Sequence, residues 1–146
     1  DAMDIRRIEG AIFNNGSDID ATMTPHAAGM GGFVAMDKGD FFGRKALEGA
    51  DPRTRMYGIA CKDAEALVGG PVARGGKQIG HITASGWSPY LEQGVAFVRL
   101  ESADLVEPRG VEVMGFDLKM HPAQIVDLPF YDPEKRIPRG LDKPQV

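Results

Sequence analysis

The residue whose type and setting best suit chemistry in this chain is Glu9, which follows Arg6 and Arg7 and precedes Gly10. Spacing alone favours a structural interpretation, a surface carboxylate paired with an arginine, and such a pair contributes little to stability. The same carboxylate could accept two hydrogen bonds in a bidentate arrangement from a heterocycle that presents a row of N–H donors. Glu9 is therefore a candidate for binding such a ring as well as for a surface ion pair.

A pterin ring presents donors of this kind, and a folate joins that ring to a glutamate tail. A folate site would therefore need a carboxylate at the ring end and a lysine or arginine at the tail end. The basic residues available for the second role are Lys38, Arg44, Lys135 and Arg136. Each of them also fits the simpler interpretation of a solvated surface charge.

Other kinds of chemistry find little support in the sequence. The three histidines, His26, His81 and His121, lie far apart, and none has a cysteine or second histidine at metal-ligand spacing. No G-x-S-x-G segment offers a serine nucleophile, and the run Gly75-Gly76-Lys77 lacks the rest of a phosphate-binding loop. We therefore expect no metal site and no nucleophile of these kinds.

Cys61 is the only cysteine, so the chain cannot form an internal disulfide. A reducing compartment suits such a chain, and we expect it to be cytoplasmic. Cys61 ends the apolar run Met56–Cys61, where a buried structural cysteine is the usual outcome. A reactive thiol needs an exposed, electropositive setting instead, so the sequence does not favour a catalytic cysteine.

The composition is that of an ordinary globular chain. It has 146 residues, 42% hydrophobic and 26% charged, which suffices for one domain or one small domain plus part of another. The net charge of -4 disfavours sequence-independent nucleic-acid binding, which needs an excess of Lys and Arg on one face. No apolar run approaches the roughly 20 residues that span a bilayer, so we expect neither nucleic acid nor membrane as a partner.

The first third of the chain predicts short elements separated by turns. Near-helical spacing of apolar residues predicts a helix within Ala2–Asn14, and Thr24-Pro25 can open a second, brief one. Phe33–Met36 is typical of a short strand. Asp40 then fits the N-cap of a helix that runs towards Leu47.

From Thr54 onward the pattern changes to a period of two, which is typical of strands. The six predicted strands are Arg55–Cys61, Pro71–Arg74, Gln78–Ser85, Val95–Leu100, Gly110–Met114 and Leu118–Asp127. Arg74–Lys77 predicts a tight hairpin turn, because its two central glycines accept positive φ. Ser85–Pro89 is interpreted as a loop. Six short strands favour closure into a small barrel, which leaves no open edges.

The ordered motifs together resemble the glycine cleavage T-protein family of aminomethyltransferases, in its C-terminal portion. The early motifs are Arg7–Gly10, Gly16–Asp20, Thr24-Pro25, Gly29–Gly31 and Lys38–Arg44. The later ones are Gly80, Thr83 and Ser85, then Ser88-Pro89 with Leu91, and finally Leu128–Pro133. The resemblance extends to about Arg136. Because the pattern opens part-way through, we expect the sequence to be the back part of a longer transferase.

The resemblance implies a mainly β fold with a short α+β N-terminal segment. Residues 1–48 would end a folate-binding domain, and residues 49–134 would form a six-stranded Greek-key barrel. The composition of residues 135–146, with Pro138, Gly140, Pro144 and several charges, predicts an extended tail instead. On matching positions, Glu9 falls on the family's pterin-contacting glutamate. Lys38 falls where some members carry a contacting arginine, and Arg136 lies near a basic residue that reaches the cofactor. The implied cofactor is tetrahydrofolate.

The family's reaction transfers a one-carbon unit from an amine to tetrahydrofolate; in T-proteins the donor is an aminomethyl group on the lipoyl arm of a carrier protein. The family ties this chemistry to an aspartate in the front half of the protein. We therefore expect no catalytic residue in this chain, which would be inactive alone. Its expected partners are the N-terminal half of the folate domain and a lipoyl carrier protein.

An alternative is a folate-binding or docking module of a related dehydrogenase, demethylase or non-catalytic assembly factor, all of which share this architecture. Trp87 and Tyr90 would support docking if they form an exposed aromatic pair. The simpler interpretation is that both side chains cap the barrel.

Overall fold

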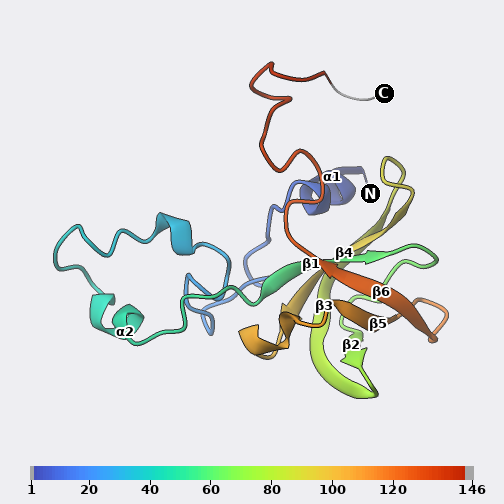
Figure 1. Ribbon diagram of the computed structural model, residues 1–146, viewed down its shortest axis with the longest axis horizontal. Helices are drawn as coiled ribbons and strands as arrows, with labels where there is room; N and C mark the ends of the chain where they lie inside the picture. The colour runs from blue at the N-terminus through green and yellow to red at the C-terminus, as the bar shows by residue number, and fades with distance from the viewer. Residues whose placement is uncertain (1, 144–146) are drawn as a thin grey trace.

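Six β-strands form a closed antiparallel barrel in the computed structural model, which describes residues 2–143 (Figure 1). The strands are β1 (Met56–Cys61), β2 (Pro71–Arg74), β3 (Lys77–Ser88), β4 (Gln93–Leu100), β5 (Gly110–Met114) and β6 (Met120–Val126). Their order around the barrel is β1-β4-β3-β2-β5-β6, and β6 pairs back with β1. The first four strands in this order form a Greek key. The predicted mainly β fold with a six-stranded barrel is confirmed.

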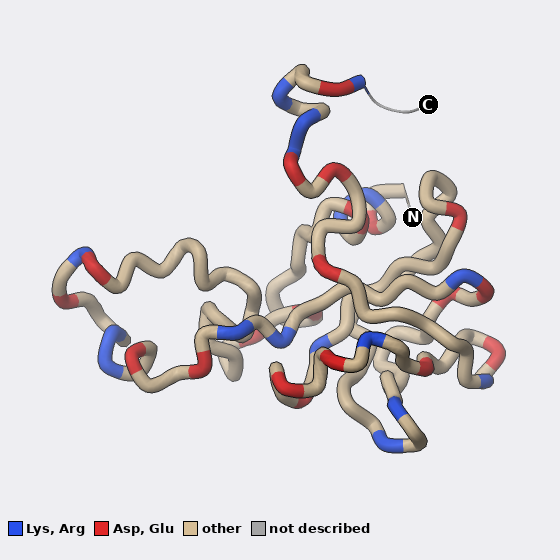
Figure 2. The backbone as a smooth tube through the Cα atoms, in the orientation of Figure 1, with Lys and Arg blue, Asp and Glu red and all other residues tan. Residues whose placement is uncertain are grey.

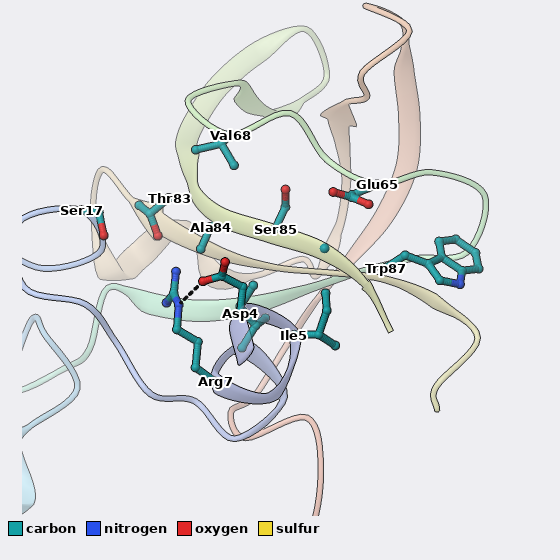
Figure 3. A pocket seen from close by; sticks show the side chains of 12 residues that line it. Asp4, Ile5, Arg7, Ser17, Glu65, Val68, Thr83, Ala84, Ser85 and Trp87 are labelled. Atoms are coloured by element: carbon teal, nitrogen blue, oxygen red, sulfur yellow. Dashed lines mark hydrogen bonds and ion pairs between the residues drawn. The ribbon is translucent and has the colours of Figure 1, made fainter. Parts of the chain in front are cut away.

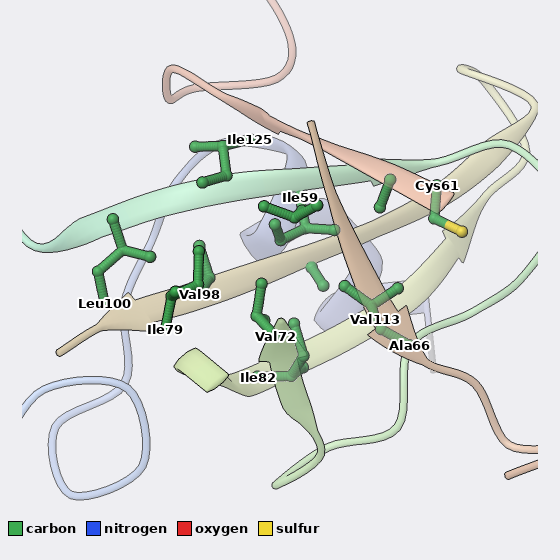
Figure 4. Packing of buried hydrophobic residues seen from close by; sticks show 13 residues of the cluster. Ile59, Cys61, Ala66, Val72, Ile79, Ile82, Val98, Leu100, Val113 and Ile125 are labelled. Atoms are coloured by element: carbon green, nitrogen blue, oxygen red, sulfur yellow. The ribbon is translucent and has the colours of Figure 1, made fainter. Parts of the chain in front are cut away.

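The interior of the barrel is filled by aliphatic side chains from every strand (Figure 4). The period-two pattern of the sequence sends alternate residues inward, so each short strand buries two or more of them. The largest fully buried ones are Ile59, Val72, Ile82, Val98, Leu100, Val113 and Ile125. Burying an aliphatic side chain of this size stabilises a fold by about 1.5–3 kcal/mol. This core keeps the barrel closed around its own side chains.

The turn between β2 and β3 agrees with its prediction. Arg74 pairs with Lys77, and the two residues between them, Gly75 and Gly76, have φ of 57° and 77°. Positive φ at both central positions is the signature of a type I′ hairpin turn, which only glycine and a few polar residues adopt readily. The predicted hairpin is confirmed.

Strand β3 is longer than predicted and curves around the barrel (Figure 1). Its register to β4 shifts between Ile82 and Ala84, so Thr83 is the extra residue of a β-bulge. The strand continues through Trp87 to Ser88, which pairs with Gln93. The interpretation of Ser85–Pro89 as a loop was therefore wrong as far as Ser88, because β4 supplies ladder partners along this whole stretch.

Helix α1 (Ala2–Glu9) packs against the outside of the barrel, over β3 and β4. Ile8 is its buried residue, and it joins a second apolar cluster with Met56, Ala84 and Phe97. The helix lies within the predicted range Ala2–Asn14 and ends at Glu9, where Gly10 follows and Ala11 takes a φ of 57°. Its C-terminal end is thereby fixed against the barrel.

Residues 20–54 lead from the α1 region to β1. Asp20 and Met23 lie against the barrel. The part that carries the 3₁₀ turn η1 (Gly31–Phe33) and the helix α2 (Arg44–Glu48) extends away from it as a lobe, at the left of Figure 1. The predicted strand Phe33–Met36 was wrong, because no strand lies beside it to complete a ladder. The predicted N-cap at Asp40 was wrong too, since the cap is Gly43 with φ of 89°.

The brief helix predicted after Thr24-Pro25 is instead a series of turns. The Thr24 hydroxyl still accepts a hydrogen bond from the Ala27 N–H at 3.1 Å, as an N-cap would. A second 3₁₀ turn, η2 (Ala103–Val106), leads from β4 to β5. No helix between residues 2 and 143 has the length and apolar character to cross a membrane.

Candidate functional site

The carboxylate of Glu9 lies at the end of α1, where it meets the end of β3. The Ser88 hydroxyl donates a hydrogen bond to Glu9 Oε1 at 2.5 Å. Ser88 is fully buried, whereas Glu9 is partly exposed. Residues 79 positions apart are thus joined across the boundary between helix and barrel. Glu9 Oε2 has no hydrogen-bond partner among the described residues.

The backbone around Glu9 is held as well. Its carbonyl oxygen accepts a hydrogen bond from the Tyr131 N–H at 3.2 Å. Tyr131 belongs to the segment that follows β6 and passes beside α1 (Figure 1). Three parts of the chain therefore converge on Glu9: the end of α1, the β3–β4 turn, and the segment after β6.

Tyr131 also contacts the β3–β4 turn through its ring. It stands edge-to-face against Tyr90, with ring centroids 4.8 Å apart and an interplanar angle of 76°. Burial of the phenol raises the pKa of Tyr131 above its usual value, and Tyr90 and the nearby carboxylates of Asp132 and Glu9 add to this. Tyr131 is therefore a neutral hydrogen-bonding group at physiological pH.

A small cavity opens beside this aromatic pair. Its volume is about 310 Å³, and its lining residues are Tyr90, Tyr131, Asp132, Ile137, Asp142 and Lys143. Tyr90 lines it from the β3–β4 turn, and the other residues line it from the segment after β6. Stacking surface together with carboxylates is suited to a planar, donor-rich molecule.

A larger cavity of about 560 Å³ lies between α1 and β3 (Figure 3). Asp4 and Arg7 face it from the helix, while Ser85, Gly86 and Trp87 face it from the strand. Glu9 lines neither this space nor the smaller cavity; the smaller cavity is linked to Glu9 through Tyr131, whose N–H donates to the Glu9 carbonyl oxygen. We assign the candidate site by its polar groups rather than by size.

Beneath α1, a fully buried carboxylate supports the site. Asp18 accepts hydrogen bonds from Arg7 Nη1 at 2.9 Å, from the Thr83 hydroxyl at 2.7 Å and from the Asn14 N–H at 2.8 Å. These donors come from the helix, the β3 bulge and the intervening loop. Asp18 therefore fixes the helix that carries Glu9 onto the barrel.

A second polar contact links the lobe to the barrel. Arg99 of β4 donates to the Asp20 carboxylate at 2.8 Å and to the Thr22 hydroxyl at 2.8 Å. The pKa of Asp20 lies well below its usual range, chiefly because the Thr22 hydroxyl donates to it, with Arg99 as the next cause. Asp20 is therefore ionised throughout the neutral range.

Lys38 and Arg136 occupy different surroundings from Glu9. Lys38 is exposed on the lobe, between η1 and α2, with its Nζ 4.7 Å from the centroid of the Phe41 ring. Figure 1 shows this lobe directed away from α1. Arg136 is exposed on the tail, where its Nε lies 2.6 Å from the Asp142 carboxylate. Lys38 is thus not adjacent to Glu9 in this structure, and Arg136 is engaged by its own tail.

Ser88, Asp18 and Tyr131 surround the candidate site but were not among the predicted site residues, because little in the local sequence marks them. Ser88 was assigned to a loop, and nothing in its neighbourhood marks it as a partner of Glu9. Asp18 is one carboxylate among the acidic residues Asp18 and Asp20, and only the fold reveals which one is buried. Tyr131 was quoted only within the motif Leu128–Pro133.

The described residues give no support for a metal site or a reactive cysteine. Within residues 2–143, no group of three or more His, Cys, Asp or Glu side chains could hold a metal ion. Cys61 is buried, with its Sγ 3.6 Å from the Pro122 carbonyl oxygen. Figure 2 shows acidic and basic residues interspersed along the described chain, an arrangement suited to a solvated surface.

Comparison with known proteins points to one family. Residues 55–132 match the family described as the Glycine cleavage T-protein C-terminal barrel domain. Similar curated proteins are the aminomethyltransferases of Synechococcus sp. (strain WH7803), 38% identical, and of Nostoc sp. (strain PCC 7120 / SAG 25.82 / UTEX 2576), 37% identical, both over 137 residues. Each alignment covers 89% of this chain and 36% of the relative.

A solved structure is similar over the same extent. The crystal structure of glycine cleavage system aminomethyltransferase T from Bartonella henselae matches with a TM-score of 0.76 and 26% sequence identity. The match covers 90% of this chain and 38% of that chain. The chain therefore spans a little over a third of the length of the relatives that it resembles.

Proposed function

We propose that this chain, which belongs to the family of the glycine cleavage T-protein C-terminal barrel domain, supplies one wall of a tetrahydrofolate site in a one-carbon transferase. The observation that carries this proposal is the setting of Glu9. Its carboxylate is anchored at one oxygen by Ser88, while the other oxygen has no partner among residues 2–143. A group held in this way is ready to accept N–H donors from a planar ring.

The residues around Glu9 fit a pterin ring. The neutral phenol of Tyr131 and the ring of Tyr90, which stand edge-to-face, offer aromatic surface near the carboxylate. Glu9 would accept hydrogen bonds from the N–H groups of the ring. The fully buried Ser88 holds one oxygen of this carboxylate by a hydrogen bond. We therefore assign Glu9 the role of orienting the ring.

Arg136 and Lys38 are our proposed contacts for the negatively charged tail of the folate. Arg136 lies on the segment five residues after Tyr131, and a ligand carboxylate would take the place of Asp142 on its guanidinium. Lys38 would contribute only if the lobe approached the ligand, because it now lies apart from α1. Arg136 is thus the stronger of the two proposals.

Bound tetrahydrofolate would supply the acceptor for the one-carbon unit. This chain would bind and orient that acceptor, and we assign it no catalytic residue. Positioning of this kind accelerates a transfer because the reacting groups no longer have to find each other in solution. The amine donor, and a lipoyl carrier protein as its bearer, are part of the same proposal.

The proposal also includes a further protein surface that completes the site. Phe33 and Phe42 of the lobe are almost fully exposed, and the relatives are nearly three times as long as the matched region. We propose that the front part of a folate-binding domain covers this lobe. In this division of the chain, residues 1–48 are the end of that domain, residues 49–134 are the barrel domain and residues 135–146 are a tail. A reducing compartment such as the cytoplasm suits the single buried Cys61.

Calorimetric titration of tetrahydrofolate into the intact protein that carries this chain tests the proposal. We expect binding that weakens at least about tenfold in Glu9→Ala, because a charged hydrogen-bond pair is lost. Glu112→Ala is the matched control, since Glu112 is an exposed glutamate of β5. Equal affinity of the wild type and Glu9→Ala would refute the proposed role.

A docking module is the second candidate, and one observation favours it. Trp87 and Tyr90 are 42% and 43% exposed, so neither is a buried cap of the barrel. Exposed aromatic residues of this kind are enriched at the centres of protein interfaces. In this alternative the β3–β4 turn would contact a carrier protein or a neighbouring domain.

A further inference from the structure

We propose that Ser88 is a positioning residue of the same folate site: it fixes the plane of the Glu9 carboxylate and so determines which ring edges can bind. This inference rests on the proposed function of Glu9. Its basis is the hydrogen bond between the Ser88 hydroxyl and Glu9 Oε1, the shortest polar contact that Glu9 makes. The barrel would then take part in ligand selection through a residue that never touches the ligand.

The direction of this hydrogen bond follows from the capacity of a hydroxyl group. A serine hydroxyl carries one proton and two lone pairs. The Leu91 N–H donates to Ser88 Oγ at 3.0 Å, which occupies a lone pair. A carboxylate can only accept, so the single hydroxyl proton of Ser88 goes to Glu9 Oε1. The hydroxyl is thereby engaged on both sides, by the Leu91 N–H and by Glu9.

Ser88 has no freedom to turn away from this arrangement. Its side chain is fully buried, and its backbone pairs with Gln93 at the last rung of the β3–β4 ladder. The hydroxyl is thus fixed both by the strand and by the Leu91 N–H of the turn. Because this donor is rigid, it holds the Glu9 carboxylate, at the end of helix α1, in a fixed position relative to the barrel.

Fixing one oxygen matters because the last torsion of a glutamate side chain is broad. Without a partner, the carboxylate plane rotates through a wide range. With Oε1 bound to Ser88 and the Glu9 carbonyl bound to the Tyr131 N–H, the free Oε2 keeps one orientation. Two N–H donors on a planar ring need both carboxylate oxygens in their own plane, and Oε1 keeps a second lone pair beside the one that Ser88 occupies. Ser88 would therefore select rings that present a pair of adjacent donors.

A double-mutant cycle tests this role. Tetrahydrofolate is titrated calorimetrically into the intact protein as wild type, Ser88→Ala, Glu9→Ala and the double variant. The matched control is Ser85→Ala, because the Ser85 hydroxyl is on the same strand but has no hydrogen-bond partner among the described residues. Thermal melting of each variant verifies folding. If Ser88→Ala does not fold, Ser88→Cys takes its place, since a thiol is a weak donor of similar size.

We expect Ser88→Ala to weaken binding about tenfold in the wild-type background. In the Glu9→Ala background the same substitution should have almost no effect, because no side-chain acceptor is left to orient. Ser85→Ala should leave affinity unchanged. A purely structural serine would instead weaken binding equally in both backgrounds, and that result would overturn the inference.

The remaining outcomes separate this inference from the proposed function. Weakened binding by Glu9→Ala with unchanged binding by Ser88→Ala would overturn the role of Ser88 and leave the role of Glu9 intact. No binding of tetrahydrofolate by the wild type would overturn both.

Discussion

The guanidinium of Arg7 lies 2.9 Å from the carboxylate of Asp18, whose side chain is completely buried. Arg7 belongs to α1, and Asp18 also accepts a hydrogen bond from Thr83 in the β3 bulge. One carboxylate thus fastens the helix to the barrel, two residues before Glu9. The geometry of the candidate site depends on this buried ion pair.

Replacing Arg7 by alanine should destabilise the protein by about 3–5 kcal/mol, because Asp18 would remain buried without a counter-charge. Urea unfolding of Arg7→Ala measures the loss. Arg53→Ala is the control, since Arg53 pairs with Asp51 and Asp104 on the surface and should matter little. Similar stability of the two variants would contradict the structural role of the Arg7–Asp18 pair.

Gly94 of β4 should not tolerate a side chain. A Cβ at this position would lie 2.0 Å from the Ala64 carbonyl oxygen, a backbone atom that cannot easily move. We expect Gly94→Ala to lower the free energy of unfolding by about 2 kcal/mol. Gly32→Ala is the matched control, because no atom lies within 4 Å of its Cβ position. The account fails here if both variants melt at the same temperature.

The Asp20–Arg99 contact should make stability depend on pH. Hydrogen bonds from Thr22 and Arg99 hold the pKa of Asp20 far below that of the unfolded chain. The folded state therefore gains stability from ionised Asp20 above about pH 4, and it loses this gain as the pH falls below that value. Melting temperatures of wild type and Asp20→Asn should differ most near pH 6 and converge towards pH 3. A constant difference would rule out this linkage.

Trp87 should contribute little to stability. Because 42% of its surface is exposed, we expect Trp87→Ala to cost about 1 kcal/mol or less. Phe97→Ala provides the contrast, since the fully buried Phe97 ring packs edge-to-face on Phe13 and its loss should cost about 3–5 kcal/mol. A large loss of stability from Trp87→Ala would instead make Trp87 part of the core and weaken the docking alternative.

The barrel could be predicted from the sequence because its signals are local. Alternating apolar residues and turn glycines mark each strand, and the Arg74–Lys77 turn agrees with its type. The lobe was harder, because short segments such as Phe33–Met36 adopt strands only when a partner strand exists. The end of β3 was missed because its Gly-, Ser- and Pro-containing sequence is typical of a loop. It is a strand in the structure because β4 pairs with it as far as Ser88.

The candidate site could be predicted only in part. Glu9 stands out once its neighbours along the chain are taken together, but its partners come from far away in sequence. Ser88 lies 79 residues from Glu9, and Thr83 lies 65 residues from Asp18. Contacts at such separations depend on how the barrel closes, which no local pattern encodes. Lys38 and Arg136 remain predictions for the same reason.

The most direct test is a crystal structure of the intact protein with bound tetrahydrofolate. The account predicts that two N–H donors of the pterin ring lie about 2.7–3.2 Å from the Glu9 carboxylate, while Ser88 keeps its hydrogen bond to Oε1. A ring bound through other side chains, with Glu9 in contact only with Ser88, would contradict the central claim.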